Sequence, residues 1–165
     1  MTDVDWGELD YLIFDLPPGT GDIQLTLVQT IPLTGAVIVT TPQEVSLIDA
    51  RKALKMFERV NVPVLGVVEN MSYFIAPDTG NKYDIFGSGG GEKICKELNT
   101  TLLGGIPIDP RIRQGGDNGI PMVFGIPDAK ETHILMDISR KLTDQVNIRN
   151  SNAADKIEIL LGDED

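Results

Sequence analysis

The sequence places one carboxylate where a magnesium ion could be held beside a nucleotide. Asp15 ends the apolar run Tyr11-Leu12-Ile13-Phe14 and is followed by Leu16-Pro17-Pro18-Gly19-Thr20-Gly21-Asp22. A carboxylate at the tip of a buried strand lies in the ligand crevice of an α/β protein, where it can hold a Mg²⁺-bound water near phosphates. Pro17-Pro18 restricts the backbone before Gly19, whose bare N–H can approach a γ-phosphate. The string favours a nucleotide site, and the alternative is an aspartate that ends a strand and caps a turn.

Two further segments follow apolar runs and could surround a nucleotide base. Asn70 comes after the run 64–68, and its amide offers a donor and an acceptor together, which suits an adenine edge. The alternative for Asn70 is an Asx-turn that closes the strand. Pro107-Ile108-Asp109-Pro110 comes after the run 101–104, and its two prolines fix an extended backbone that could lie along a base ring. A rigid surface loop explains the same prolines, and composition does not separate the two.

Three other features are weaker candidates. The run Gly87-Ser88-Gly89-Gly90-Gly91-Glu92-Lys93 does not have the phosphate-loop spacing, which would need glycine in place of Glu92 and serine or threonine in place of Ile94. We expect it to be a flexible lead into a helix. The chain has one cysteine, Cys95, and one histidine, His133, so a zinc site built from this chain alone is not expected, and both side chains are interpreted as structural.

The order of apolar runs and amphipathic segments predicts the elements that position these residues. We expect an α/β fold, with a mostly parallel sheet and helices on both of its faces. Buried strands are predicted at 11–15, 36–40, 64–68 and 101–104, and helices at 23–29, 42–60, 92–98 and 129–146. Residues 70–83 are predicted to form a loop, and residues 147–165 an acidic, flexible tail with a candidate strand at 157–161.

Two helix starts and two helix faces are also predicted. Asp22 should cap the first helix, and Thr41-Pro42-Gln43-Glu44 should start the second as a capping box. The apolar residues expected to face inward on the second helix are Val45, Ile48, Leu54, Phe57 and Val60. Those expected to face inward on the last helix are Ile134, Leu135, Ile138 and Leu142.

Composition excludes several classes of function. The chain has 165 residues, of which 25 are acidic and 14 basic, and its formal net charge of −11 argues against nucleic acid or an anionic membrane as a partner. The length fits one domain, and 41% apolar residues fit an ordinary globular protein. There is no apolar run long enough to span a bilayer, and the first residues are acidic, so we expect a cytoplasmic protein.

Several strings together resemble the Mrp/ApbC iron–sulfur carrier proteins, which are P-loop ATPases related to the MinD/ParA group. The resemblance extends in the same order from about Leu9 to Leu142. The strings that carry it are Tyr11-Leu12-Ile13-Phe14-Asp15-Leu16-Pro17-Pro18-Gly19-Thr20-Gly21-Asp22, Thr41-Pro42-Gln43-Glu44, Asp49-Ala50-Arg51-Lys52, Glu69-Asn70-Met71-Ser72-Tyr73-Phe74, Ile85-Phe86-Gly87 and Ile106-Pro107-Ile108-Asp109-Pro110-Arg111-Ile112.

The resemblance implies a cytoplasmic, homodimeric ATPase that binds ATP and Mg²⁺ and delivers a [4Fe–4S] cluster to apo iron–sulfur proteins. On that basis Asp15 is the Mg²⁺-associated carboxylate and Pro17-Pro18-Gly19 belongs to the switch that senses the γ-phosphate. Asn70 and Pro107-Ile108-Asp109 would surround the adenine.

Two departures limit what the resemblance implies. The family's P-loop should lie about 100 residues before Asp15, and the residues that precede Asp15 here include no lysine. Residues 1–146 are therefore interpreted as the C-terminal part of the ATPase domain, with a P-loop NTPase fold that lacks the P-loop and its strand. We expect this chain alone to be inactive in ATP hydrolysis.

The second departure is at the cluster site. Many family members carry C-P-x-C shortly after the Glu69–Phe74 string, and here that place holds Ala76-Pro77-Asp78-Thr79. A [4Fe–4S] cluster needs about four thiolates, and a dimer would offer one Cys95 from each copy. We therefore expect no stable cluster at this position. Two other functions are considered, a MinD/ParA-like positioning ATPase and a non-enzymatic interaction domain.

Overall fold

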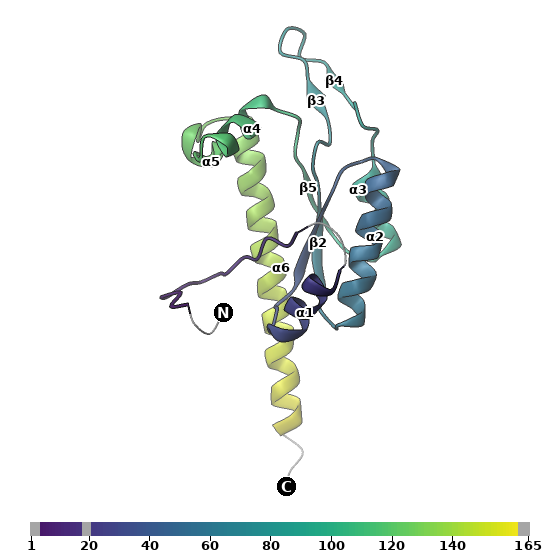
Figure 1. Ribbon diagram of the computed structural model, residues 1–165, viewed down its shortest axis with the longest axis vertical. Coiled ribbons are helices and arrows are strands. Elements are labelled where there is room, and N and C mark those ends of the chain that lie inside the picture. Colours follow the sequence, from purple (N-terminus) through teal and green to yellow (C-terminus); the bar gives the residue numbers. More distant parts are fainter. Residues whose placement is uncertain (1–3, 18–20, 162–165) are drawn as a thin grey trace.

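The computed structural model describes residues 4–17 and 21–161 and is built around a three-stranded parallel sheet (Figure 1). Its strands are β1 (Ala36–Thr40), β2 (Val64–Glu69) and β5 (Leu102–Gly105), and β2 lies in the middle. All three form where short apolar runs predict buried strands, and the runs that form β1 and β2 are rich in β-branched residues. The predicted α/β class with a parallel sheet is confirmed.

Helices cover both faces of this sheet (Figure 1). One face packs against α2 (Glu44–Arg59) and α3 (Gly90–Glu97), and the other packs against α6 (Lys130–Leu161). Because successive strand residues point to opposite faces, each face has its own core. The core on the α2 side contains Val28, Ile38, Leu47, Leu54, Phe57, Val67 and Ile94, and the core on the α6 side contains Val68, Leu103 and Ile138.

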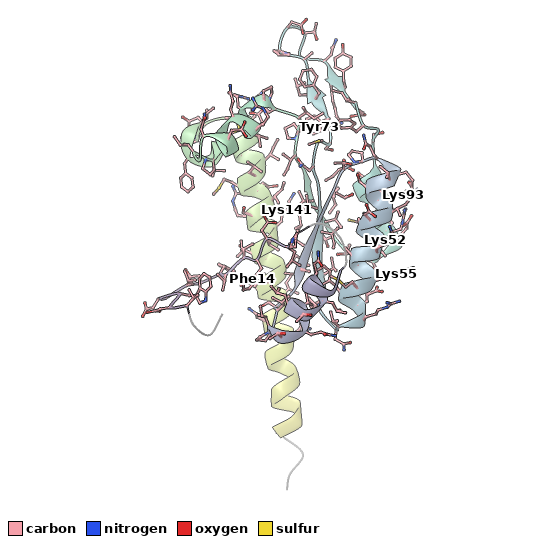
Figure 2. The ribbon with its side chains drawn as sticks, in the orientation of Figure 1. Phe14, Lys52, Lys55, Tyr73, Lys93 and Lys141 are labelled. Carbon is pink, nitrogen blue, oxygen red and sulfur yellow. The ribbon has the colours of Figure 1, made fainter. Side chains whose placement is uncertain are left out.

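Charged side chains join the outer surfaces of α2 and α3. Arg51 pairs with Glu44 at 2.9 Å and with Glu97 at 2.8 Å. Lys93, which Figure 2 labels, has its Nζ 3.1 Å from Glu44. The Arg51 guanidinium donates to Glu97 and holds the pKa of that carboxyl below its ordinary value. Exposed pairs add little stability, so the network contributes little to the packing of α3 against α2.

The predicted strand at 11–15 is wrong. These residues belong to no strand, and Ile13 is 82% exposed. A run that is apolar on both faces is stable as a strand only when neighbouring strands pair with it and layers cover it. Among the described residues the sheet ends at β1, and nothing pairs with this run. Leu16, just after this run, packs against the core on the α2 side.

Both predicted N-caps are also wrong. Helix α1 (Asp22–Thr30) includes Asp22 as its first residue, and Gly21 is its N-cap. Helix α2 begins only at Glu44, and the extended residue Gln43 is its N-cap without a side-chain hydrogen bond. The Thr41 hydroxyl donates to Ser46 Oγ at 2.7 Å instead of capping the helix. The chain stays extended here because Pro42 is buried directly against Gly90, at the start of α3.

The inward face of α2 is partly as predicted. Leu54 and Phe57 are buried, but Val45 is 66% exposed and Ile48 is 46% exposed. Leu47 and Ala50 are buried in their place. On α6, the expected inward residues Ile134, Ile138 and Leu142 do pack against the sheet.

Several elements were not predicted. Residues 70–83 contain a small antiparallel hairpin of β3 (Phe74–Ile75) and β4 (Lys82–Tyr83), which projects beyond the sheet (Figure 1). Two short helices, α4 (Pro110–Asp117) and α5 (Met122–Gly125), follow β5. Helix α6 continues past residue 146 to Leu161, where a tail and a candidate strand were expected. In the part of the chain that the structure describes, we find no helix with the length and apolarity needed to span a membrane.

Two adjacent glycines of α4 should respond oppositely to alanine. A Cβ on Gly115 would lie 2.8 Å from the Ile120 carbonyl oxygen and 3.1 Å from the Met122 nitrogen, whereas a Cβ on Gly116 would meet nothing within 4 Å. We expect Gly115→Ala to destabilise the protein by about 1–3 kcal/mol through overpacking. Gly116→Ala should stabilise it by up to about 1 kcal/mol through helix propensity. Urea unfolding of both variants measures this, and equal effects would contradict the described contact of α4 with the turn before α5.

Candidate functional site

The carboxyl ends of β1, β2 and β5 meet at one edge of the sheet. The Asn70 backbone N–H donates to the Thr40 carbonyl oxygen at 2.7 Å, and the Ile106 N–H donates to the Glu69 carbonyl oxygen at 2.8 Å. In parallel α/β sheets ligands bind at this edge, because the loops there can diverge around a crevice. The edge is therefore the first place to look for a site.

Asn70 begins a tight turn directly after β2. Its Oδ1 accepts the N–H of Met71 at 2.9 Å, and Met71 has the left-handed φ of 55°. An Asx-turn would instead engage the N–H of the second residue on. Among the described residues, no hydrogen bond from Asn70 Nδ2 is found, and the side chain is half-buried. An amide donor is thus available at the edge of the sheet.

The segment 107–109 lies beside the Asn70 turn. Ser72 N–H donates to the Ile106 carbonyl oxygen at 2.9 Å, and Ile108 N–H donates to the Tyr73 carbonyl oxygen at 2.7 Å. Because of these two bonds, the backbone of residues 72–73 lies alongside the backbone of residues 106–108. Pro107 is buried and Ile108 is half-buried. The structure therefore brings together two of the three groups that the sequence singled out.

The carboxylate of Asp109 has a structural role of its own. It caps α4 by accepting the Arg111 N–H at 2.7 Å, and the Arg111 guanidinium lies 2.6 Å from Asp109 and 2.8 Å from Glu131. The guanidinium, and to a lesser degree the backbone N–H, hold the pKa of Asp109 below its ordinary value. Asp109 thus fixes where α4 begins and where α4 meets α6.

Replacing Asp109 with alanine should destabilise the protein by about 0.5–2 kcal/mol, the usual cost of a lost N-cap. The folded-state pKa lies below the unfolded value of about 3.9. The ionised carboxylate therefore contributes stability above that pH and loses it as the pH falls through the folded-state pKa. Urea unfolding of both proteins from pH 7 to pH 3 should show the difference in free energy of unfolding shrinking, and a constant difference would contradict this role.

The third group, around Asp15, is not brought to this edge. Asp15 is exposed, and no hydrogen bond or ion pair within 4–17 and 21–161 joins it to Asn70 or Asp109. Pro17 is also exposed, and its carbonyl oxygen accepts from Gln24 Nε2 at 3.2 Å. Pro18 and Gly19 lie outside the described residues. The unpaired run before Asp15 explains its position, since no strand carries it to the sheet.

Sequence reasoning assigned no role of its own to Glu69, which is 6% exposed. Its Oε2 accepts the N–H of Gly91 at 2.5 Å, and its Oε1 accepts the hydroxyl of Ser72 at 2.5 Å. The glycine run leads into α3 as expected, and a carboxylate of the protein itself already binds an N–H in the first turn of that helix. The feature of the sequence that could have pointed to Glu69 is its position as an acidic residue at the end of an otherwise apolar strand.

Residues 76–79, where the resemblance implies a cysteine pair, form the tip of the β3–β4 hairpin. Ala76 accepts the Gly80 N–H at 2.8 Å and donates to the Asn81 carbonyl oxygen at 2.9 Å, and Pro77, Asp78 and Thr79 are exposed between them. Lys82 Nζ, on β4, lies 4.8 Å from the centre of the ring of Tyr73, which Figure 2 labels. No group of three metal-binding side chains occurs among the residues that the structure describes.

The surroundings of Cys95 do not suit a ligand of an iron–sulfur cluster. It is 6% exposed in α3, and burial, followed by the charges of Glu69 and Glu92, raises the pKa of its thiol. Both effects disfavour the thiolate that metal binding needs. The predicted structural role of Cys95 agrees with this position.

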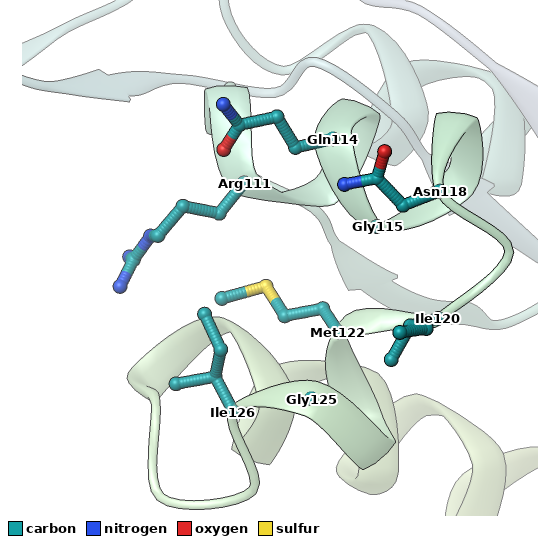
Figure 3. Close-up of a pocket in the computed structure, with 8 residues that line it drawn as sticks. All are labelled: Arg111, Gln114, Gly115, Asn118, Ile120, Met122, Gly125 and Ile126. Carbon is teal, nitrogen blue, oxygen red and sulfur yellow. The ribbon is translucent and has the colours of Figure 1, made fainter.

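A hollow of about 230 Å³ lies between α4 and α5 (Figure 3). Arg111 and Gln114 reach it from α4 and Asn118 from the C-cap of that helix, and Met122 and Ile126 line the opposite side. Sequence reasoning missed it because neither helix was predicted. Its Arg111 is engaged with Asp109 and Glu131, so the hollow presents no free charge for a phosphate.

Comparison with known proteins gives a consistent result. The family model described as ParA, NUBPL iron-transfer P-loop NTPase, matches residues 1–143. The chain is 57% identical over 146 residues to an iron-sulfur cluster carrier protein from Synechocystis sp., covering 88% of this chain and 41% of that protein. It is 55% identical over 149 residues to one from Deinococcus radiodurans, covering 90% and 42%. The chain thus spans less than half the length of these relatives.

Solved structures agree with the fold. A nucleotide-binding protein from Archaeoglobus fulgidus in complex with ADP is 44% identical, with a TM-score of 0.62 over 69% of this chain and 47% of that one. The cell division ATPase MinD from Pyrococcus furiosus, 24% identical, has a TM-score of 0.52 over 67% of this chain and 43% of that one, and supports the fold alone.

Proposed function

Since the chain belongs to the ParA family of NUBPL-type iron-transfer P-loop NTPases, we propose that it forms the base-binding and Mg²⁺-binding part of the ATP site of an iron–sulfur cluster carrier. The observation that carries this proposal is the pairing of the Asn70 turn with the segment 107–109 at the carboxyl edge of the sheet. The relatives are named iron-sulfur cluster carrier proteins. The protein would act in the cytoplasm, as a homodimer, and deliver its cargo to apo iron–sulfur proteins.

The residues present fit an adenine nucleotide. Asn70 Nδ2 can donate to a ring nitrogen, and its Oδ1, shared with the Met71 N–H, can accept from the exocyclic amine. The buried Pro107 and half-buried Ile108 supply an apolar wall for the base. Pro107 and the bond from Ile108 N–H to Tyr73 fix the backbone of this wall before any ligand arrives.

The phosphate side of the site would be formed by the segment around Asp15. An exposed carboxylate provides the oxygen that Mg²⁺ prefers, and it would hold the ion through a water while the ion neutralises phosphate charge. Pro17, Pro18 and Gly19 would sense the γ-phosphate. This segment must first be carried to the sheet, which requires a strand that pairs with the run 11–15.

The experiment uses a chimera in which the 146 matched residues of the Synechocystis relative are replaced by the corresponding residues of this chain. We expect isothermal titration to show Mg·ADP binding to the chimera, with clear preference over Mg·GDP. Asn70→Ala should weaken ADP binding about tenfold and remove the preference. The matched control is Asn118→Ala, which removes an exposed amide at the C-cap of α4. Equal binding by both variants and the chimera would refute the proposed base site.

The iron–sulfur cargo does not fit the hairpin of this chain. Ala76 and Thr79 replace the two cysteines, and the remaining Cys95 is buried in another element. We propose that the hairpin binds no stable cluster, so that cargo binding is altered or lost. Anaerobic reconstitution of the chimera should leave it without stoichiometric iron. About four irons per dimer with a thiolate-to-iron absorption band would overturn this.

A further inference from the structure

We infer that Glu69 is a positioning residue which holds the Asn70 turn in the orientation needed for base binding. This inference rests on the proposed function, because it gives Glu69 a role in that same site. Glu69 would not touch the nucleotide. It would act through Ser72 on one side and through α3 on the other.

The first step is the pair of hydrogen bonds that Glu69 accepts. Both carboxylate oxygens are used, one by the Ser72 hydroxyl and one by the Gly91 N–H, each at 2.5 Å. The side chain is 6% exposed. A buried carboxylate that accepts two bonds is tightly oriented, and removing it leaves two donors without partners. One side chain thus joins the end of β2, the turn after it and the start of α3.

The second step is the turn that these bonds enclose. Asn70 and Met71 lie between Glu69 and Ser72, and Met71 has a φ of 55°, which a residue with a long side chain rarely adopts. Such a conformation persists where its surroundings fix it. The main chain is held on one side, where Ser72 N–H donates to Ile106 and Ile106 N–H donates to Glu69. The Glu69 carboxylate holds the other side, through Ser72 Oγ.

The third step is the close packing around this carboxylate. A Cβ on Gly91 would lie 3.1 Å from both Glu69 Cβ and Glu69 Oε2, and a Cβ on Gly105 would lie 2.8 Å from Ser72 Oγ. A side chain at either glycine would therefore clash with Glu69 or Ser72, and glycine avoids that clash. This gives a reason for Gly91 and Gly105 that does not involve a phosphate. We infer that the contact of Glu69 with Ser72 and Gly91, which lies between β5 and α3, sets the direction of the Asn70 side chain.

The experiment measures the turn by NMR on this chain and Mg·ADP binding by isothermal titration of the chimera. Glu69→Ala should speed amide exchange at Gly91 about tenfold or more, shift the side-chain NH₂ signals of Asn70, and weaken Mg·ADP binding about tenfold. Glu69→Gln keeps an acceptor for Gly91 and a group that can bond Ser72, so it should restore all three readouts to within about threefold. The matched control is Glu58→Ala on the exposed side of α2.

A second variant guards against simple unfolding of Glu69→Ala. Ser72→Ala removes only the bond to the turn, so it should shift the Asn70 signals and weaken ADP binding while leaving Gly91 exchange unchanged. Unchanged Asn70 signals in both alanine variants would overturn the inference, and so would a failure of Glu69→Gln to restore them. If the unsubstituted chimera does not bind ADP, the proposed function fails, and the Asn70 and Gly91 signals of this chain still decide whether Glu69 holds the turn.

Discussion

Replacing Asp15 with asparagine in the chimera is expected to lower the kcat for ATP hydrolysis about 100-fold or more. The charge that Asp15 contributes would hold Mg²⁺ against the phosphates, and loss of one such electrostatic contribution in an active site commonly costs this much. The affinity for Mg·ADP should change far less, since the base is bound by Asn70 and the segment 107–109. The same substitution should leave the fold of this chain unaffected, because Asp15 is exposed here and has no partner in the described parts of the chain.

The matched control for this change is Asp10→Asn. Asp10 lies in the same segment, which forms no helix or strand, is also exposed, and loses the same charge. Steady-state phosphate release from the chimera and the two variants, measured side by side, decides the matter. Hydrolysis by Asp15→Asn at the rate of Asp10→Asn would show that Asp15 does not serve the metal.

Replacing Ile94 with alanine should destabilise this chain by about 2–5 kcal/mol. Ile94 is 0% exposed at the centre of α3, and its side chain lies in the core on the α2 side. The substitution removes apolar contacts and leaves a cavity that a packed core fills only in part. Because α3 also carries the Gly91 N–H that Glu69 accepts, the loss should loosen the Asn70 turn as well.

Urea unfolding measures this effect, with Ile148→Ala as the matched control. Ile148 is also helical but 54% exposed, so its replacement should change the free energy of unfolding by less than about 0.5 kcal/mol. A loss below 1 kcal/mol at Ile94 would mean that α3 does not form part of the core. That outcome would also mean that α3 does not hold the Gly91 N–H in place for its hydrogen bond to Glu69.

The central sheet could be predicted because its strands are short, apolar and flanked by turn residues. The runs 36–40, 64–68 and 101–104 are strands in the structure, to within one residue at each end. The run 11–15 has the same local character and still forms no strand. Local pattern shows that a segment can be a strand, whereas pairing depends on which other segments are present to bond with it. The local pattern of the run 11–15 therefore could not show whether a strand is present to pair with it.

The missed helices have a different cause. Helix α4 has few apolar residues and two glycines, so it gives little helical periodicity. The signal that was present is Asp109 followed by Pro110, an N-cap residue before a proline at the first helical position. Asp109 was instead considered as part of a base-binding loop. Both interpretations use the same residue, and the structure places it as a cap beside that loop.

The candidate site could be predicted only in part. Asn70 and the segment 107–109 could be grouped because each follows a strand of a parallel sheet, and carboxyl ends of such strands share an edge. Glu69 could not, because its partners Ser72 and Gly91 are known only once α3 is placed. Asp15 has the right chemistry for Mg²⁺, but its place at the sheet depends on a strand that pairs with the run 11–15.

The most direct test of the central claim is a crystal structure of the chimera with Mg·ADP. We expect the adenine to lie at the carboxyl edge of the sheet, within hydrogen-bond distance of Asn70 Nδ2 and against Pro107 and Ile108. Asp15 should then lie on the phosphate side, near the metal. An adenine bound elsewhere, for example in the hollow between α4 and α5, would contradict the proposed site.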